Sequence, residues 1–410
     1  MTKNNISIDE KIKIISKGAA EIIDTKELRQ KLIDAEKNNK QLTVKLGLDP
    51  TAPDIHLGHT VVLRKVRQIQ DLGHRAIIII GDFTGMIGDP TGRSKTRKQL
   101  TTEEVLENAE TYKKQMFKIL DPEKTKVCFN SEWLSKFDFK DVINLAAKYT
   151  VTRMLERDDF KKRFKAQQSI AIHEFMYPLM QGYDSVAIKA DIELGGTDQR
   201  FNILVGRTLQ KEYGLEKQIA IFMPILEGTD GIEKMSKSLG NYIGIDESST
   251  EMYGKVMSIP DEMIIKYYEL VTDIHPDELE KIKEKLQHGE VNPRDIKMSL
   301  AKEIVRLYHG ETEAQKAEEH FKSVFQKGNI PKDIPEFKID FEDVENGKVD
   351  IINIVKSMKF TSTNRETKRL LEQGAIKLNG NKLLSLEDVK IADGDVIQVG
   401  KRKFVKVVLA

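Results

Sequence analysis

One strand–helix–strand segment near the start of the chain constrains the fold more than any other feature. Residues 43–49 predict a strand that stops at Pro50, which has no N–H to donate to a neighbouring strand. A helix is expected from about residue 57 to 72, where Gly73 ends it. Residues 76–80 are a continuous apolar run, as in a strand buried on both faces. This βαβ unit predicts a parallel sheet covered by helices.

The first 245 residues continue the same alternation. Further strand candidates lie at 126–130, 187–193 and 219–225, with helical stretches between them. Strands alternating with helices indicate an α/β class protein with a doubly wound, Rossmann-like sheet. Such sheets bind ligands at the carboxyl ends of their strands. We therefore expect a Rossmann-like catalytic domain over residues 1–245.

Three further segments are expected after residue 245. Residues 246–326 are helical and charged, with few strand signals. Residues 327–349 contain Pro331 and Pro335 among scattered acids and are typical of a linker. Residues 350–410 predict a separate small α+β unit, in which a short helix is followed by turns and short apolar strands.

Charge is distributed unevenly along the 410 residues, although the whole chain has a net charge of only +1. Residues 350–410 contain 12 Lys and Arg against 7 Asp and Glu, and this excess favours a polyanion-binding tail. Cys128 is the single cysteine, which excludes an intrachain disulfide and a cysteine-based zinc site. No apolar run reaches membrane-spanning length and the first residues lack an apolar leader, so we expect a cytoplasmic protein without a membrane partner.

A His-x-Gly-His motif opens the helix of the first βαβ unit. His56 and His59 are three residues apart and share one face of the first turn, where outward-pointing amides favour phosphate. Gly58 between them lets a flat base approach the backbone, and Thr51 is placed to donate to a phosphate oxygen. Two exposed histidines without function are the alternative. The preceding strand and the helix start favour an ATP site.

A second motif, Lys234-Met235-Ser236-Lys237-Ser238, lies between glycine-containing turns. Two lysines and two hydroxyls suit a triphosphate whose charge moves outward as the bond between its α- and β-phosphates breaks. A solvated basic loop is the alternative, but the five-residue string is far more specific than two lysines three residues apart. We therefore expect Lys234 and Lys237 to act in catalysis, and Lys237 and Ser238 to bind ATP.

The two motifs together resemble the HIGH and KMSKS signatures of the class I aminoacyl-tRNA synthetases. The resemblance is closest to the bacterial tyrosyl-tRNA synthetases and extends over essentially the whole chain. It implies a ligase that forms tyrosyl-adenylate from L-tyrosine and ATP and then transfers tyrosine to the 3′ end of tRNA-Tyr. It also implies Mg²⁺ bound with ATP and no dedicated protein metal site. A homodimer with an interface in about residues 110–180 is implied as well.

The amino-acid pocket is expected on a later helix. Tyr177, Gln181 and Asp184 have helical spacing that directs all three to one place. The resemblance assigns Tyr177 and Gln181 to the substrate's amino group and Asp184 to its phenolic hydroxyl. It also places Asp89 near the amino group, with Thr84 nearby. An amphipathic core helix and a simple turn at Asp89 are the alternatives.

The segment from Gly195 to Gln199 follows a predicted strand and opens a helix. Its glycines, Gly196 among them, allow close approach of a nucleotide, and Asp198 suits ribose hydroxyls. The resemblance implies that Asp198 binds the ribose, that Gln199 orients the reacting carboxyl and that Asp49 lies near the adenylate. A plain Gly-Gly turn with a capping Asp is the alternative.

One departure from the better-known bacterial branch lies in the first strand. That branch has Tyr-Cys before the glycine of its Gly-Phe-Asp-Pro sequence, whereas this chain has Lys45-Leu46 before Gly47. The chain thus resembles the second bacterial form, and the partner that the Tyr would offer the substrate hydroxyl is missing. Asp82, at the end of the second strand, is a candidate replacement, with a simple cap as the alternative.

The last sixty residues resemble an S4 RNA-binding domain. Arg365, Lys368 and Arg369 have the spacing of one helix face, and Lys401–Lys403 adds a basic run near the end. Phosphate contacts from such a stripe supply affinity for RNA more than sequence reading.

Three other functions share parts of this pattern. Tryptophanyl-tRNA synthetases share the fold and both motifs, but that family generally lacks an S4 tail and the Tyr-x-x-x-Gln-x-x-Asp pattern. Small-molecule nucleotidyltransferases use His-x-Gly-His in much shorter chains. An RNA-binding protein with a decayed catalytic domain is disfavoured because both motifs and Asp198 are intact.

Overall fold

The computed structural model describes residues 6–48, 55–85, 110–325, 334–339, 348–358, 360–361, 363–383, 389–400 and 403–409. By its internal contacts the chain divides into two compact units, residues 1–314 (unit 1) and 315–410 (unit 2).

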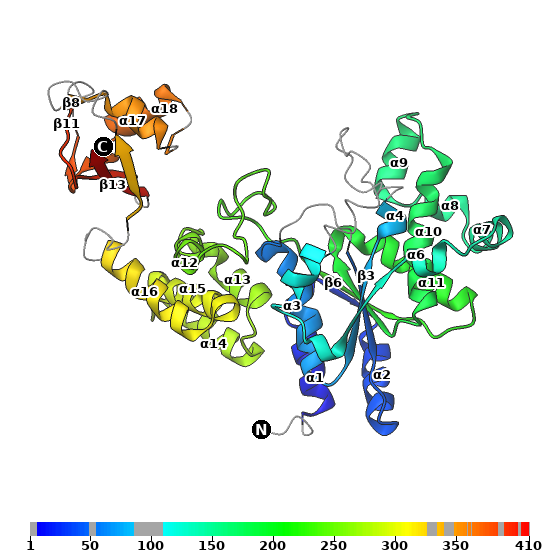
Figure 1. The fold of residues 1–410 in the computed structure, drawn as a ribbon. Helices are drawn as coiled ribbons and strands as arrows, with labels where there is room; N and C mark the ends of the chain where they lie inside the picture. The colour runs from blue at the N-terminus through cyan, green and yellow to red at the C-terminus, as the bar shows by residue number, and fades with distance from the viewer. Residues whose placement is uncertain are drawn as a thin grey trace. The chain divides into compact units, whose positions relative to one another are not determined.

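Unit 1 is built on a six-stranded sheet with the strand order β1-β6-β5-β2-β3-β4. The edge strand β1 is antiparallel to β6, and every other neighbouring pair is parallel. Figure 1 shows α1 and α3 on one side of this sheet and α10 and α11 on the other. The predicted doubly wound α/β sheet is therefore confirmed. Its strands are β1 (Glu21–Ile23), β2 (Thr43–Leu48), β3 (Arg75–Ile80), β4 (Thr125–Phe129), β5 (Ile192–Gly196) and β6 (Ile219–Met223).

Short and long helices connect these strands. They are α1 (Ile8–Ser16), α2 (Thr25–Lys37), α3 (Leu57–Asp71), α4 (Asp82–Gly85), η1 (Pro122–Lys124), α6 (Ser131–Leu134), α7 (Phe139–Ala146), α8 (Val151–Met154), α9 (Asp158–Lys165), α10 (Ile172–Ala187), η2 (Thr197–Gln199) and α11 (Arg200–Glu212).

One local expectation was wrong, and one strand was not predicted. The unpredicted strand is β1, which pairs with the edge of β6 between α1 and α2. The strand expected at 187–193 begins only at Ile192, because α10 continues to Ala187 and the chain reverses through Lys189 at a φ of 51°.

The centre of the sheet is apolar because both of its faces are covered. In β3, Ala76 and Ile78 through Ile80 are at most 1% exposed, which explains the continuous apolar run. Each isoleucine buried in this way contributes about 1.5–3 kcal/mol relative to an exposed one. β2 lies between β3 and β5 and shares this burial, so its polar residue Lys45 is also 0% exposed.

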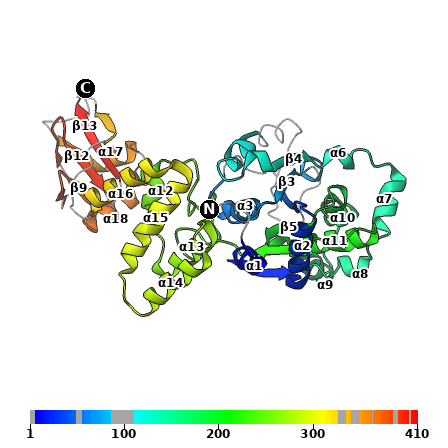
Figure 2. The same cartoon turned by 90° about the horizontal axis from the view of Figure 1, so that it is seen from below.

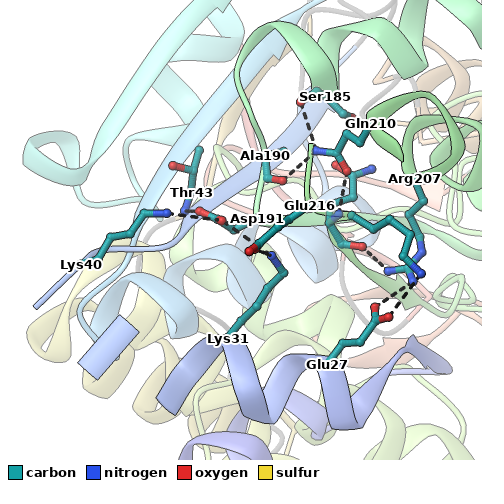
Figure 3. Close-up of polar contacts among 12 residues, drawn as sticks. Glu27, Lys31, Lys40, Thr43, Ser185, Ala190, Asp191, Arg207, Gln210 and Glu216 are labelled. Carbon is teal, nitrogen blue, oxygen red and sulfur yellow. Dashed lines mark hydrogen bonds and ion pairs between the residues drawn. The ribbon is translucent and has the colours of Figure 1, made fainter. Parts of the chain in front are cut away.

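A polar network closes the amino end of the sheet (Figure 3). Asp191, just before β5, accepts a hydrogen bond of 2.8 Å from the Thr43 N–H at the start of β2. The Gln210 amide donates to the Ser185 carbonyl at 3.3 Å and to the Ala190 carbonyl at 2.9 Å. These bonds join α10, α11 and the start of β5, so they set where α10 ends relative to the sheet.

A helical part completes unit 1. It comprises α12 (Ser249–Val256), η3 (Asp261–Met263), α13 (Ile264–Val271), α14 (Pro276–Gln287) and α15 (Pro293–His309). Arg64 of α3 forms an ion pair of 2.7 Å with Asp273, which attaches this part to the sheet's helices. α14 and α7 lie at opposite ends of unit 1 in both views (Figures 1 and 2).

Helix α16 (Glu311–Phe325) spans the division between the units, and unit 2 has its own core. Its five-stranded sheet has the order β10-β9-β12-β13-β7, and β8 pairs with β11. Apolar residues of these strands and of two helices form its buried cluster. The elements are β7 (Glu336–Ile339), β8 (Lys348–Val349), α17 (Ile351–Ser357), α18 (Asn364–Glu372), β9 (Ile376–Leu378), β10 (Asn381–Lys382), β11 (Val389–Lys390), β12 (Val396–Val399) and β13 (Lys403–Leu409). Within the described ranges, no helix has the length and apolar character needed to cross a membrane.

Candidate active site

A cavity of about 570 Å³ opens at the carboxyl ends of β2, β3 and β5. Gly47 and Leu48 of β2, Gly81 after β3 and Gly195 of β5 line it. This is the position where doubly wound sheets bind ligands, because the strand order changes direction there.

The His-x-Gly-His motif forms the start of α3. His56 is the N-cap residue, and its ring stacks on that of His59 with 3.8 Å between centroids. His56 Nδ1 accepts from the Gly58 N–H at 3.2 Å, and His59 Nδ1 accepts from the His56 N–H at 3.3 Å. Because both Nδ1 atoms accept, each neutral ring carries its proton on Nε2 and can donate it to a ligand.

Burial and nearby lysines keep both histidines neutral. Burial, then His59 and the two lysines of the second motif, lowers the pKa of His56 to about 3. Burial and the same lysines, Lys234 and Lys237, lower the pKa of His59 to about 4. The positive charge at this end of the cavity therefore comes from the lysines, and the histidines act as neutral hydrogen-bond donors.

The two motifs contact each other although they are far apart in the sequence. Met235, 1% exposed, places its sulfur 3.3 Å from the Gly58 nitrogen. A Cβ at Gly58 would lie 3.0 Å from the His56 ring, so a larger residue there would push that ring by a few tenths of an ångström. Backbone bonds from Leu57 N to Ile243 O (2.9 Å) and from Ile245 N to Ile55 O (3.2 Å) join the loop to α3.

The loop of the second motif is held by one asparagine. Asn241 accepts from the Ser236 N–H at 2.8 Å and donates to Asp230 at 2.7 Å. Ser238 shares a hydroxyl contact of 2.8 Å with Ser236, and the Lys237 ammonium lies 5.6 Å from the Tyr242 ring. These contacts place both lysines beside the histidine motif.

The other end of the cavity is formed by α10. Tyr177, Gln181 and Asp184 all line it, and α10 continues through Pro178 without interruption. Gln181 Oε1 is buried and has no hydrogen-bond partner among the described residues. This end therefore offers an acceptor oxygen and a carboxylate.

Asp184 is buried and held by two side chains that the sequence interpretation missed. Its carboxylate accepts from Trp133 Nε1 at 2.8 Å and from Asn130 Nδ2 at 3.5 Å. Burial raises the pKa of Asp184 to about 7, against the opposing effects of Lys45, Trp133 and Asn130. Asn130 follows β4 directly, so its position at the carboxyl end of a strand could have identified it as a site residue. No local sequence pattern identifies Trp133.

Asp82 has the capping role that was the alternative to a ligand contact. Its carboxylate accepts from the backbone N–H groups of Phe83 (2.9 Å) and Ser131 (3.0 Å) and from the Ser131 hydroxyl (2.5 Å). Thr84 lines the cavity, and its hydroxyl accepts from Asn130 Nδ2 at 3.0 Å.

The nucleotide segment follows β5 as expected. Gly196 ends the strand, and Asp198 and Gln199 of η2 line the cavity before α11 begins. A Cβ at Gly195 would lie 2.6 Å from Ile203 Cδ1, so a larger residue there would force the Ile203 side chain to shift. The predicted residues Asp49, Thr51 and Asp89 lie outside the described residues.

The predicted RNA-binding residues belong to unit 2. Arg365, Lys368 and Arg369 are all exposed on α18, and the buried residues of this helix are Thr367 and Leu371. The three cations thus lie on the side of α18 that faces away from the core of unit 2.

The fold and the two motifs meeting over one cavity define a class I aminoacyl-tRNA synthetase. The family described as tRNA synthetases class I (W and Y) matches residues 37–326. Tyrosine--tRNA ligase 2 of Clostridium acetobutylicum is 65% identical over 98% of this chain and 99% of its own length. The tyrosine--tRNA ligase of Thermotoga maritima is 54% identical over 97% of both chains. The chain belongs to this W and Y family of class I tRNA synthetases.

Solved structures agree with this assignment. The tyrosyl-tRNA synthetase from Archaeoglobus fulgidus, complexed with L-tyrosine, is 26% identical and superposes with a TM-score of 0.60. The match covers 76% of this chain and 100% of that one.

The raised pKa of Asp184 predicts that this carboxyl destabilises the fold at alkaline pH. Its pKa is about 7 in the folded chain against 3.8 ordinarily, so the folded state loses stability as pH rises from about 4 through 7. We expect Asp184→Asn to raise the free energy of unfolding of unit 1 by about 1–3 kcal/mol at pH 8 and much less at pH 4.5. Urea unfolding followed by fluorescence of Trp133, the single tryptophan, measures this.

Asp34→Asn, at an exposed position of α2, is the matched control and should show no such pH dependence. An Asp184→Asn chain that is less stable than the original at pH 8 would contradict the raised pKa.

Proposed function

We propose that this chain is a tyrosine–tRNA ligase. It joins L-tyrosine to ATP as tyrosyl-adenylate and then transfers tyrosine to the 3′ end of tRNA-Tyr. One observation carries the proposal. A single cavity has the two ATP motifs at one end and the buried Asp184 carboxylate at the other. The names of the relatives at 54–65% identity support the same substrate.

The first step needs alignment more than it needs a protein nucleophile. The carboxylate of the amino acid attacks the α-phosphorus, and the bond to the β-phosphate breaks as pyrophosphate leaves. The His56 and His59 Nε2–H groups donate to phosphate oxygens, and Lys234 and Lys237 stabilise charge that grows on the pyrophosphate. In the second step a ribose hydroxyl of the tRNA attacks the tyrosyl carbonyl and AMP leaves.

The amino acid lies between these groups and α10. Gln181 Oε1, buried and without a partner among the described residues, accepts from the substrate ammonium beside Tyr177. Asp184 accepts from the phenolic hydroxyl, because a charged acceptor forms a strong hydrogen bond with a phenol. We assign Asp89 and Thr84 to the surroundings of the amino group. Gln199 orients the carboxylate.

The nucleotide occupies the end near α3 and η2. Asp198 binds the ribose, Gly58 and Gly196 allow close approach of the base and sugar, and Ser238 contacts a phosphate. Asp49 and Thr51 complete the site. Mg²⁺ comes with ATP, held mostly by phosphate oxygens and water.

ATP–pyrophosphate exchange without tRNA tests the proposal. We expect exchange with tyrosine, and exchange at least a thousandfold weaker with phenylalanine and tryptophan, since a buried carboxylate left without a donor is costly. Lys237→Ala should slow exchange about a hundredfold or more while tyrosine binding changes little, because its charge acts on the leaving group. Strong exchange with tryptophan would instead indicate a tryptophan–tRNA ligase of the same family.

We propose that the basic stripe of α18 binds tRNA. Arg365, Lys368 and Arg369 together contribute phosphate contacts, so replacing all three by Ala should weaken tRNA binding about tenfold or more. The slope of log affinity against log salt should also fall by about 2–3. Fluorescence anisotropy with tRNA at several salt concentrations measures both quantities.

The matched control removes three exposed lysines elsewhere in unit 2, namely Lys338, Lys356 and Lys390. An equal loss of affinity in this control would mean that the α18 stripe is not the binding face. Tyrosine-dependent exchange without tRNA serves as the check on unit 1.

We propose that the chain forms a homodimer through residues within about 110–180 and acts in the cytoplasm. Exposed apolar side chains between α7 and the start of α10 support this interface. A monomer would leave them in contact with water. They are Phe139 (81% exposed), Ile143 (53%), Val151 (62%), Phe164 (63%) and Ile172 (82%). α7 lies at the end of unit 1 away from α14 (Figure 2), so this surface is separate from the helical part.

Placing charges on this surface should dissociate the dimer. We expect Val151→Asp combined with Ile172→Asp to sediment as a monomer at micromolar concentration, because a buried unpaired carboxylate is costly. Ile232→Asp, at a position 80% exposed in the loop of the second motif, should remain dimeric. A double variant that remains dimeric would place the interface elsewhere.

A further inference from the structure

Lys45 is a charged residue that is fully buried in the middle of the sheet. It lies in β2, is 0% exposed, and pairs in register with Ile77 of β3 and Glu193 of β5. Its ammonium lies 2.8 Å from the Glu193 carboxylate, and both side chains are at most 2% exposed. A buried ion pair is weak evidence for stability, because desolvation offsets most of the attraction. The position therefore calls for a role other than stability.

The Lys45 ammonium contacts α10 on both sides of Asp184. It donates to the Gln181 carbonyl at 2.9 Å and to the Ser185 hydroxyl at 2.8 Å. Ser185 in turn donates to Glu193 at 3.0 Å, and its carbonyl accepts from Gln210 (Figure 3). The ammonium is thus fixed beside the turn of α10 that presents Asp184 to the cavity.

Several charged groups surround Asp184. Lys45 of β2 favours the Asp184 carboxylate, whereas Glu193 of β5 opposes it. Asn130 and Trp133, from the segment after β4, donate hydrogen bonds to Asp184. The Asp82 carboxylate accepts a hydrogen bond from the Ser131 N–H. On α10 itself, Glu174 is paired with Arg163.

Among the residues that the structure describes, Lys45 is therefore the basic group that offsets the burial of Asp184. The histidines of the cavity add no charge above about pH 5.

We propose that Lys45 is a positioning residue that determines amino-acid specificity, by keeping Asp184 charged at neutral pH so that the site requires a hydroxyl donor. The inference rests on the proposed function, in which the cavity binds tyrosine. A charged, buried Asp184 rejects phenylalanine, which leaves the carboxylate without a donor, whereas a protonated Asp184 tolerates it better. Lys45 thereby supports discrimination at the position where the better-known branch has a tyrosine.

The test measures binding of tyrosine and phenylalanine to the full-length chain by calorimetry between pH 5.5 and 9. In the original chain, tyrosine affinity should rise through about pH 7 as Asp184 ionises. Lys45→Met removes the charge and retains most of the volume. The midpoint should then move up by about one to three pH units, the typical effect of one nearby charge. Tyrosine affinity at pH 7.5 should fall about threefold or more, in proportion to the ionised fraction of Asp184, and phenylalanine affinity should stay equal or rise.

Lys65→Met is the matched control. Lys65 is also buried, at 2% exposure, but its ammonium donates to the Ile14 carbonyl of α1 and it does not line the cavity. This variant should keep the original midpoint. An unchanged midpoint in Lys45→Met, or an equal loss of tyrosine and phenylalanine binding, would overturn the proposal.

Glu193→Gln provides a second test that does not depend on how well Lys45→Met folds. It removes the negative charge that opposes ionisation of Asp184, so the midpoint should move to lower pH. An upward shift or no shift would overturn the proposal. A purely structural role would not move the midpoint in opposite directions in Lys45→Met and Glu193→Gln. Absence of tyrosine binding by the original chain at every pH would instead refute the proposed function.

Discussion

The site depends on the position of β2 between β5 and β3. Parallel hydrogen bonds on both edges of β2 bring three strand ends to one place, and the strand order reverses there. The chain leaves β2 toward α3 and enters β5 from α10, so the histidine motif and the α10 side chains reach the same cavity from opposite faces of the sheet. Without this arrangement the two ends of the cavity would not face one ligand.

The two ends of the cavity have opposite electrostatic character. At the α3 end, burial and two lysines keep the histidines neutral, so they donate hydrogen bonds and add no charge. At the α10 end, the acceptors are a buried carboxyl and an amide oxygen that has no hydrogen-bond partner in the described part of the chain. A polyanion suits the first end, and a ligand with donors suits the second. This polarity supports the proposed arrangement, with ATP at the first end and the amino acid at the second.

The charged groups buried under α10 serve function more than stability. A buried carboxyl and a buried ion pair lie next to each other under α10, although apolar side chains of similar volume would pack there at no electrostatic cost. The bonds that hold α10 and β5 at the amino end of the sheet, through Asp191 and Gln210, fix the backbone on which these groups are mounted. The apolar contacts of β3 supply the stability that these buried charged groups do not.

The sequence by itself determined the fold class and most of the chemistry. Hydrophobic runs that end at glycine or proline predicted four of the parallel strands, because a strand buried on both faces needs a continuous apolar run. Helical spacing placed Tyr177, Gln181 and Asp184 on one cavity, because three residues on one helix need no knowledge of their neighbours.

Only the tertiary structure decided which distant groups set the charge of that cavity. Trp133 and Asn130 reach Asp184 across some fifty residues, and Lys45 reaches α10 across 136 and 140. The short strand β1 and the late start of β5 were also invisible locally, since edge pairing and helix length depend on what packs against them. A pKa is determined by burial and by charges close in space, and neither follows from positions along the chain.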